Sequence, residues 1–202
     1  MLDNSCDILD HNFVTAILCI NLAQGMADTL EIIKCSMSFE IEGSAKPVDV
    51  VFELYPKLLP KTCANFLALC LGGLSLCGRK MQYKNSYLHE IVPDWCVVGG
   101  DFLNGNGTGG RSIFHGNEFE DESFHAVDYD QAGLLCMLSH GPNTNTSLFF
   151  VTLKPAEWIN KLYVAFGKVV ENLSGLRALA AEAGSCSGIP KKPVKILSCG
   201  PM

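Results

Sequence analysis

Several groups of side chains in this sequence could take part in chemistry. The run Glu-Asp-Glu at 120–122 places carboxylates next to one another, as general acid–base catalysis would require. His89 is followed directly by another carboxylate, Glu90. Residues 104–110 are rich in glycine and asparagine and could form a loop around an anion. The ten cysteines could act as nucleophiles, metal ligands or disulfide partners: Cys6, Cys19, Cys35, Cys63, Cys70, Cys77, Cys96, Cys136, Cys186 and Cys199.

Most of these groups have a structural explanation that we favour. The carboxylates at 120–122 are expected to tie a loop or cap a turn. No cysteine pair is spaced C-x-x-C, and His115, His125 and His140 show no ligand spacing, so we predict no metal site. The 104–110 stretch lacks the strand–GxxxxGK–helix pattern of a phosphate loop. We therefore expect no cofactor.

Most cysteines lie inside apolar runs, where a free thiol behaves as a small hydrophobic side chain. This pattern predicts buried, reduced thiols and a reducing compartment. A few disulfides, or an exposed redox-sensitive thiol, are the alternative.

The composition indicates one folded domain with a short addition. The chain has 202 residues, of which 48% are hydrophobic and 18% charged, so it can bury a core. Its formal net charge is −6 and its basic residues are scattered, which disfavours nucleic acid as a partner. The apolar run 13–20 is too short to cross a bilayer, and the residues before it carry no Lys or Arg. We expect a soluble, cytoplasmic monomer that does not bind membranes.

The periodicity predicts the elements that would position these groups. Alternating apolar residues from Met37 and over 48–54 predict a β-hairpin that turns at 43–46. A helix is expected to begin at Pro60 and end at Gly72, and a second one to end at Gly184. Further short strands are predicted at 134–138, 148–153, 164–170 and 194–199. Many short strands with two helices favour a β-barrel or sandwich.

Residues 1–34 differ in sequence pattern from the rest of the chain and are predicted to be an N-terminal extension. Phe13, Ile17 and Ile20 have helical spacing, and Gly25 is expected to end this amphipathic helix. The extension either docks or frays, or it binds a partner.

Five stretches, taken together, resemble the cyclophilins, a family of peptidyl-prolyl cis-trans isomerases (rotamases) that act in protein folding. In chain order they are FELYPKLLPKTCANFLALC (52–70), LHEIVPDWCVVGGDF (88–102), NGTGGRSIFHGNEFEDESF (106–124), GLLCMLSHGPNTNTSLFFVTL (133–153) and EWINKLYVAFGKVVE (157–171). The resemblance implies a mainly β fold over 35–202, a closed eight-stranded antiparallel barrel capped by two α-helices. The segment between the first helix and Leu88 looks longer than in simple cyclophilins.

The resemblance also implies a site, and this sequence departs from it. Cyclophilins place a catalytic arginine after the histidine of an F-H-R-I-I-P stretch, and here that position is Glu90. Two glutamines of the family pattern are replaced by Val98 and Leu148. No catalytic residue is therefore assigned. The substrate pocket is expected to comprise Trp95, Cys96, Val98, Leu138, Ser139, His140, Leu148, Phe150, Trp158, Ile159 and Tyr163.

Two functions follow from the resemblance. The first is a peptidyl-prolyl isomerase that acts weakly on X–Pro bonds in peptides or proteins. The second is a catalytically inactive module that binds proline-containing segments. Cyclosporin binding is expected to be weak or absent, because the arginine and glutamine contacts are missing.

Overall fold

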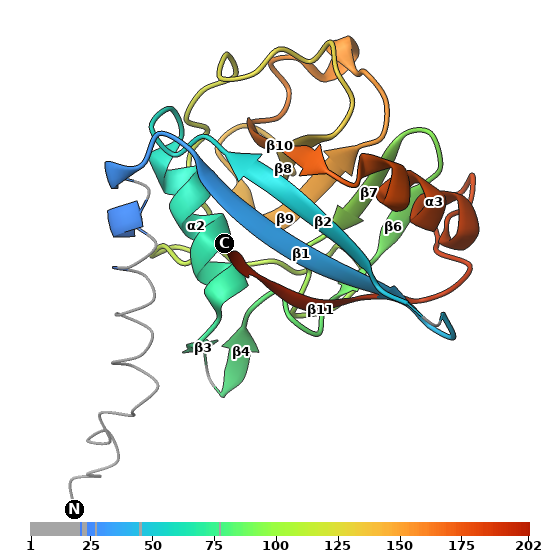
Figure 1. Ribbon diagram of the computed structural model, residues 1–202. Coiled ribbons are helices and arrows are strands. Elements are labelled where there is room, and N and C mark those ends of the chain that lie inside the picture. Colours follow the sequence, from blue (N-terminus) through green and yellow to red (C-terminus); the bar gives the residue numbers. More distant parts are fainter. Residues whose placement is uncertain (1–20, 22–23, 27, 45, 77) are drawn as a thin grey trace, which may run out of the picture.

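The structure, a computed structural model, describes residues 21, 24–26, 28–44, 46–76 and 78–202. Nine strands form one antiparallel sheet in the order β5-β11-β1-β2-β10-β8-β9-β7-β6, curled into a nearly closed barrel (Figure 1). The sheet strands are β1 (Ile33–Ile41), β2 (Val48–Leu54), β5 (Tyr87–Leu88), β6 (Glu90–Val92), β7 (Cys96–Gly99), β8 (Leu134–Ser139), β9 (Asn145–Thr152), β10 (Ala165–Glu171) and β11 (Val194–Pro201).

The barrel closes through one short run of chain. The first and last strands of the sheet order, β5 and β6, are consecutive in sequence and are separated only by His89. The His89 N–H donates to the Val98 carbonyl at 3.1 Å, which continues the pairing of β6 with β7 across the break. The eight-stranded barrel expected from the sequence is confirmed, and the ninth strand arises because one strand is divided at His89.

Alternation along the chain explains the strands. In β1, Ile33, Cys35, Met37, Phe39 and Ile41 are all buried, so one face of the strand lines the core. The strand begins at Ile33, earlier than the expected start near Met37. Residues 43–46 lie between β1 and β2, which pair as the predicted hairpin.

Two helices lie against the barrel, as predicted (Figure 1). Helix α2 (Pro60–Leu71) begins with proline at its first position and ends at Gly72, whose φ of 72° suits a residue without Cβ. Helix α3 (Leu173–Ala183) is capped by the Asn172 side chain, which accepts from the Gly175 N–H, and ends before Gly184. A short 3-10 helix, η1 (Glu157–Ile159), lies between β9 and β10.

The apolar residues form two separate clusters. The larger one fills the barrel and includes Phe66, Tyr83 and Phe149, whose rings contact one another at centroid distances of 5.2–5.5 Å. The smaller cluster has Phe150 and Ile159 among its members and lies on the other side of β9. Adjacent residues of β9, Phe149 and Phe150, therefore belong to different clusters because successive side chains point to opposite faces.

The longer segment after α2 forms a small sheet of its own, β3 (Leu74–Leu76) paired with β4 (Arg79–Met81). The helix predicted around residues 13–20 lies outside the described residues. Residues 24–26 and 28–29 are helical, and the Thr29 hydroxyl donates to the Gly25 carbonyl at 2.6 Å, so the described residues do not show the helix end that was expected at Gly25. Within the described part of the chain, no helix has the length and apolarity needed to cross a bilayer.

Candidate functional site

A buried carboxylate organises the glycine-rich loop beside the site. Asp101, 1% exposed, follows β7 and accepts five backbone N–H groups, all at 2.8–3.1 Å. The donors are Leu103, Asn104, Asn106, Gly107 and Gly109. Burial tends to raise the pKa of Asp101, but these N–H groups favour the ionised form and hold the pKa below its ordinary value. Residues 104–110 are thus a loop built around the protein's own anion.

His89 packs against this loop. A Cβ on Gly107, whose φ is 85°, would lie 2.9 Å from the His89 ring, so only glycine permits the approach. Burial lowers the pKa of His89, while the charges of Asp101 and Glu90 oppose that shift. The Nδ1 atom of His89 is buried and has no hydrogen-bond partner among the described residues. These contacts favour a neutral imidazole with a structural role.

Glu90 stands on β6 directly opposite Val98 on β7. It is exposed, and its side chain also approaches Gly188, in the segment before β11. Two effects raise the pKa of the Cys96 thiol to about 12: the larger is burial, and the smaller is the nearby Glu90 carboxylate. This position is expected from the sequence to correspond to the family's arginine, and the side chain that stands here is an exposed carboxylate.

The predicted pocket has an apolar floor, by which we mean Cys96, Val98, Phe150 and Ile159. These four side chains belong to the smaller cluster, and each is no more than 4% exposed. Strand pairing explains why they meet, since Val98 lies opposite Phe150 across β7 and β9. Leu138 also packs against this cluster. The floor is therefore covered in this structure and is not open to water.

Aromatic side chains cover the floor. Trp95 contacts Trp158 at a centroid distance of 4.6 Å and Phe150 at 6.3 Å, and Tyr163 meets Phe150 edge-on at 5.2 Å. Trp158 is 65% exposed although its ring packs against Trp95. These rings present an apolar aromatic surface at the place where the sequence predicts proline to bind.

Leu148 does not belong to the floor and lies against Gly110 of the glycine-rich loop. It is fully buried, and a Cβ on Gly110 would lie 3.0 Å from its Cγ. A glutamine at this position would have to satisfy a buried amide, whereas leucine fills the space without a polar requirement. The replacement therefore suits the packing of the loop around Asp101.

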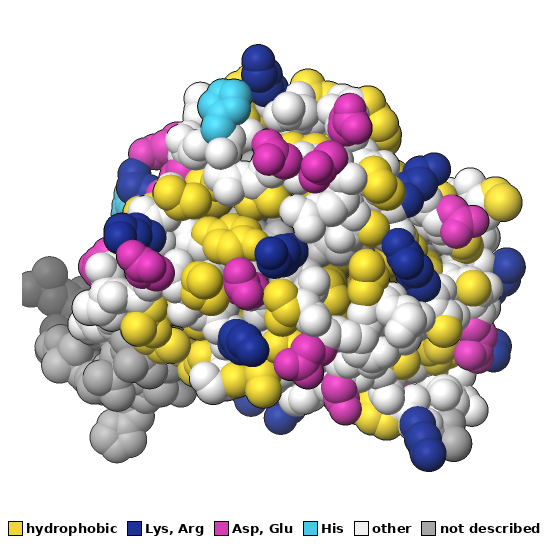
Figure 2. Space-filling model, turned by 45° about the horizontal axis from the view of Figure 1, so that its top comes forward, with side chains coloured by type: hydrophobic (Ala, Val, Ile, Leu, Met, Phe, Trp, Pro, Cys, Tyr) yellow, Lys and Arg dark blue, Asp and Glu magenta, His cyan; other side chains and the backbone are white. Residues whose placement is uncertain are grey.

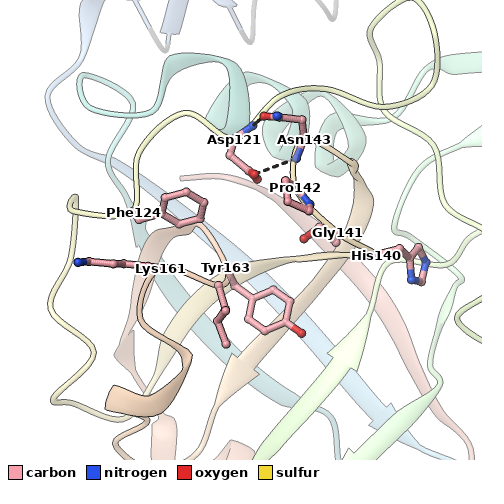
Figure 3. Close-up of a pocket in the computed structure, with 10 residues that line it drawn as sticks. Asp121, Phe124, His140, Gly141, Pro142, Asn143, Lys161 and Tyr163 are labelled. Atoms are coloured by element: carbon pink, nitrogen blue, oxygen red, sulfur yellow. Dashed lines mark hydrogen bonds between the residues drawn. The ribbon is translucent and has the colours of Figure 1, made fainter.

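Ser139, His140 and Tyr163 line an open hollow of about 660 Å³ beside the floor. Figure 3 shows Phe124, Pro142 and Tyr163 around it, with the Lys161 side chain extending outward at the left and His140 at the right. The His140 N–H donates to the Thr144 hydroxyl at 3.0 Å. The predicted pocket residues thus divide among this hollow, the covered floor with the side chains packed on it, and Leu148 beside the loop around Asp101.

The carboxylates at 120–122 have the structural roles expected of them. Glu122 accepts from the backbone N–H groups of Lys61 and Thr62 at 2.9 and 2.7 Å, and so caps the first turn of α2. Asp121 accepts from the Asn143 N–H at 2.8 Å and from the Asn145 side chain at 2.7 Å, a link drawn in part in Figure 3. Asn143 has φ of 59°, in keeping with a tight turn.

Sequence reasoning missed Tyr129. This residue is 2% exposed in the smaller cluster; its hydroxyl donates to the Tyr163 carbonyl and accepts from the Ala165 N–H at 3.0 Å. These two hydrogen bonds fix the backbone at the beginning of β10, which starts at Ala165. The stretch around Tyr129 has no periodicity that could have indicated this role. Phe124 and Lys161, which line the hollow, were also not predicted.

One face of the molecule carries mixed side chains. Figure 2 shows hydrophobic patches among charges of both signs, without a continuous basic stripe on that face. Among the residues that the structure describes, no group of three or more His, Cys, Asp and Glu side chains is placed to hold a metal ion.

The family comparison agrees with this architecture. Residues 37–201 match the model of the cyclophilin type peptidyl-prolyl cis-trans isomerase/CLD family. The match covers all of the strands of the barrel except the first residues of β1, and both helices α2 and α3. The chain belongs to the cyclophilin-type peptidyl-prolyl cis-trans isomerase family.

Proposed function

We propose that this protein binds proline-containing peptide segments on the face formed by Glu90 and the predicted pocket, and that it catalyses X–Pro isomerisation only weakly. We call this surface the peptide face. The observation that carries the proposal is the position of Glu90, whose charge acts on Cys96 at the edge of the apolar floor.

The chemistry explains why the charge matters. An X–Pro bond rotates slowly because amide resonance gives a barrier of about 18–20 kcal/mol. Catalysis requires tighter binding of the twisted amide than of the planar one. In the twisted state the prolyl nitrogen regains a lone pair, which a hydrogen-bond donor can stabilise. An ionised carboxylate can only accept, so Glu90 would repel that lone pair.

The cost of losing such a donor, in activation free energy, is known from other enzymes. Removing one transition-state donor elsewhere costs about 3 kcal/mol, or roughly a hundredfold in rate. Val98 and Leu148 are 4% and 0% exposed, and neither supplies a polar group in place of the family's glutamines. Binding of proline depends less on these groups, because the aromatic rings of Trp95, Phe150 and Tyr163 are present.

A specific observation supports the alternative, a binding module without catalysis. The floor is at most 4% exposed, whereas Trp158 is 65% exposed and contacts Trp95. A ligand can stack on this aromatic pair without entering the floor. In that case the prolyl ring would not be held in the position that rotation requires.

An isomerisation assay on a short X–Pro peptide separates the two functions. The proposed weak enzyme accelerates rotation measurably, but by less than about a thousandfold over the spontaneous process of tens to hundreds of seconds. A larger acceleration would overturn both proposals, since it would mean an efficient enzyme without the arginine. If the peptide binds but its isomerisation is not accelerated, the alternative function, a binding module without catalysis, is supported.

Binding has its own readout. The chain contains two tryptophans, Trp95 and Trp158, and both lie on the peptide face. Titration with the X–Pro peptide should change their intrinsic fluorescence, and the same peptide with alanine in place of proline serves as the control. Equal responses to the two peptides would contradict proline recognition. Cyclosporin is expected to bind weakly or not at all, which calorimetry can measure.

A further inference from the structure

The glycine-rich loop contains the only two Asn-Gly pairs of the sequence, Asn104–Gly105 and Asn106–Gly107. In such a pair the backbone nitrogen of the glycine can attack the side-chain amide carbon of the asparagine, because glycine has no Cβ to hinder the approach. The attack expels ammonia and closes a succinimide ring, which water opens to aspartate or isoaspartate. Both asparagines are exposed, so water reaches each of them.

The nucleophile of the second pair is hydrogen-bonded to a base. The Gly107 N–H donates to Oδ2 of Asp101 at 2.8 Å. A carboxylate at this distance can accept the proton that the nitrogen loses when its bond to the amide carbon forms. The Gly105 N–H of the first pair also acts on the Asp101 carboxylate, so the base alone does not distinguish the two pairs.

The side-chain oxygen of Asn106 does distinguish them. Its Oδ1 accepts two hydrogen bonds from Thr108, one from the backbone N–H at 3.0 Å and one from the hydroxyl at 2.6 Å. Attack on the amide carbon turns this oxygen into an oxyanion, so both donors stand where negative charge develops. They also hold the amide group against the backbone that follows it, which contains the nucleophile.

Asn104 lacks this arrangement. Its Nδ2 donates to the Thr108 hydroxyl at 3.1 Å, and no donor within the described part of the chain contacts its Oδ1. The two pairs therefore have the same dipeptide sequence, the same exposure and the same nearby carboxylate, but only Asn106 has donors at the oxygen that becomes charged.

We propose that Asn106 is a modification site that deamidates spontaneously with the help of the folded loop, with Gly107 as nucleophile, Asp101 as proton acceptor and Thr108 as donor to the oxyanion. The proposal concerns the chain itself and does not depend on peptide binding. Asn106 is expected to react well before Asn104.

The reaction needs only water as co-reactant. The Gly107 nitrogen bonds to Cγ of Asn106, and its proton passes to Asp101. The Cγ–Nδ2 bond then breaks, and Nδ2 leaves with that proton as ammonia. Water adds to one of the two succinimide carbonyl carbons and breaks its bond to nitrogen, which gives aspartate or isoaspartate. One amide and one water become one carboxylic acid and one ammonia.

The product would alter the loop. The Asn106 and Gly107 N–H groups both donate to Asp101, and isoaspartate adds one carbon to the main chain between them. The new carboxylate also stands close to the buried one. Because Gly107 packs against the His89 ring, we expect the modified loop to hold His89 less firmly.

The experiment incubates the full chain at neutral pH and follows both asparagines by peptide mapping with mass spectrometry. In the folded chain, Asn106 should deamidate at least about tenfold faster than Asn104, since only Asn106 has oxyanion donors. The same chain in urea is the control, because both pairs lose their contacts there. In urea the two asparagines should react at similar rates, and Asn106 should react more slowly than in the folded chain.

Two variants at one exposed position make the result decisive. Thr108→Val removes the hydroxyl donor but keeps the side-chain shape, and it should slow deamidation of Asn106 in the folded chain by about tenfold. Thr108→Ser keeps the hydroxyl and should leave the rate close to that of the original chain. Circular dichroism checks that both variants fold. The proposal is overturned if Asn104 reacts as fast as Asn106 in the folded chain, if unfolding accelerates Asn106, or if Thr108→Val leaves its rate unchanged.

Discussion

The loop around Asp101 and the peptide face lie next to each other but treat polar groups in opposite ways. The loop satisfies its buried carboxylate with five backbone N–H groups. The peptide face replaces the family's arginine and two glutamines with Glu90, Val98 and Leu148. The polar group that holds the loop is thus fully hydrogen-bonded, whereas the positions where the family resemblance predicts arginine and glutamine hold a carboxylate and two apolar side chains. The comparison shows that a scaffold and its chemistry can be separated residue by residue.

The largest expected effect tests the loop. Asp101→Asn keeps one acceptor oxygen but turns the other into an amide that cannot accept from Asn106, Gly107 and Gly109. We expect the free energy of unfolding to fall by about 3 kcal/mol, measured by urea denaturation. Asp130→Asn, on an exposed side chain, is the control. Equal effects of the two substitutions would mean that the loop does not depend on its anion.

The next prediction restores the missing polar groups. Glu90→Arg combined with Val98→Gln and Leu148→Gln should raise the isomerisation rate by up to about a hundredfold. The variant should also be less stable, because Val98 and Leu148 are at most 4% exposed. Glu90→Ala, which removes the charge but adds no donor, should give a much smaller gain. An unchanged rate in a folded triple variant would show that the geometry of the face, and not only its polarity, differs from that of an active enzyme.

A smaller effect is expected at the exposed tryptophan. Trp158→Ala should weaken binding of the X–Pro peptide by about tenfold, because a stacking surface is lost. The free energy of unfolding should change by less than about 0.5 kcal/mol, since the side chain is 65% exposed. Leu58→Ala removes an exposed apolar side chain outside the peptide face and should leave affinity unchanged. Affinity is measured by calorimetry, and equal losses in both variants would remove Trp158 from the proposed surface.

The smallest effect is the response to acid. The pKa of His89 in the folded state lies below its ordinary value of 6.5, so the unfolded chain binds the proton more tightly. Stability should therefore decrease as the pH falls below about 6.5. Asp101 has a folded pKa below 3.8, so its contribution is complete above that value and is lost as the pH falls further. In His89→Gln the first decrease should vanish and the second remain; if the first persists, another group causes it.

Much of the fold could be predicted, because it depends on local signals. Pro60 and Gly72 bound α2 as expected, and β8 to β11 lie where short strands were predicted. The division of a strand at His89 could not be foreseen, because it depends on pairing with distant residues. The hairpin of β3 and β4 lies in a segment without clear alternation.

The site was predictable in a different way. The family pattern identified positions such as Val98 and Phe150, which the fold does bring together. It did not indicate that the floor would be covered, because burial of Phe150 depends on how Trp95 and Tyr163 pack in three dimensions. Tyr129 was missed for the same reason, since its hydroxyl contacts residues more than thirty positions away.

The pairing of β1 with β11 has a consequence for synthesis of the chain. These strands lie at opposite ends of the domain sequence, and residues as distant as Cys35 and Pro201 are partners. A ribosome delivers β11 as the last strand of the domain, so one edge of β1 stays unpaired until β11 has emerged. Such non-local pairing slows folding and leaves an open edge that can join another nascent chain. The barrel is therefore completed only once β11 has emerged from the ribosome.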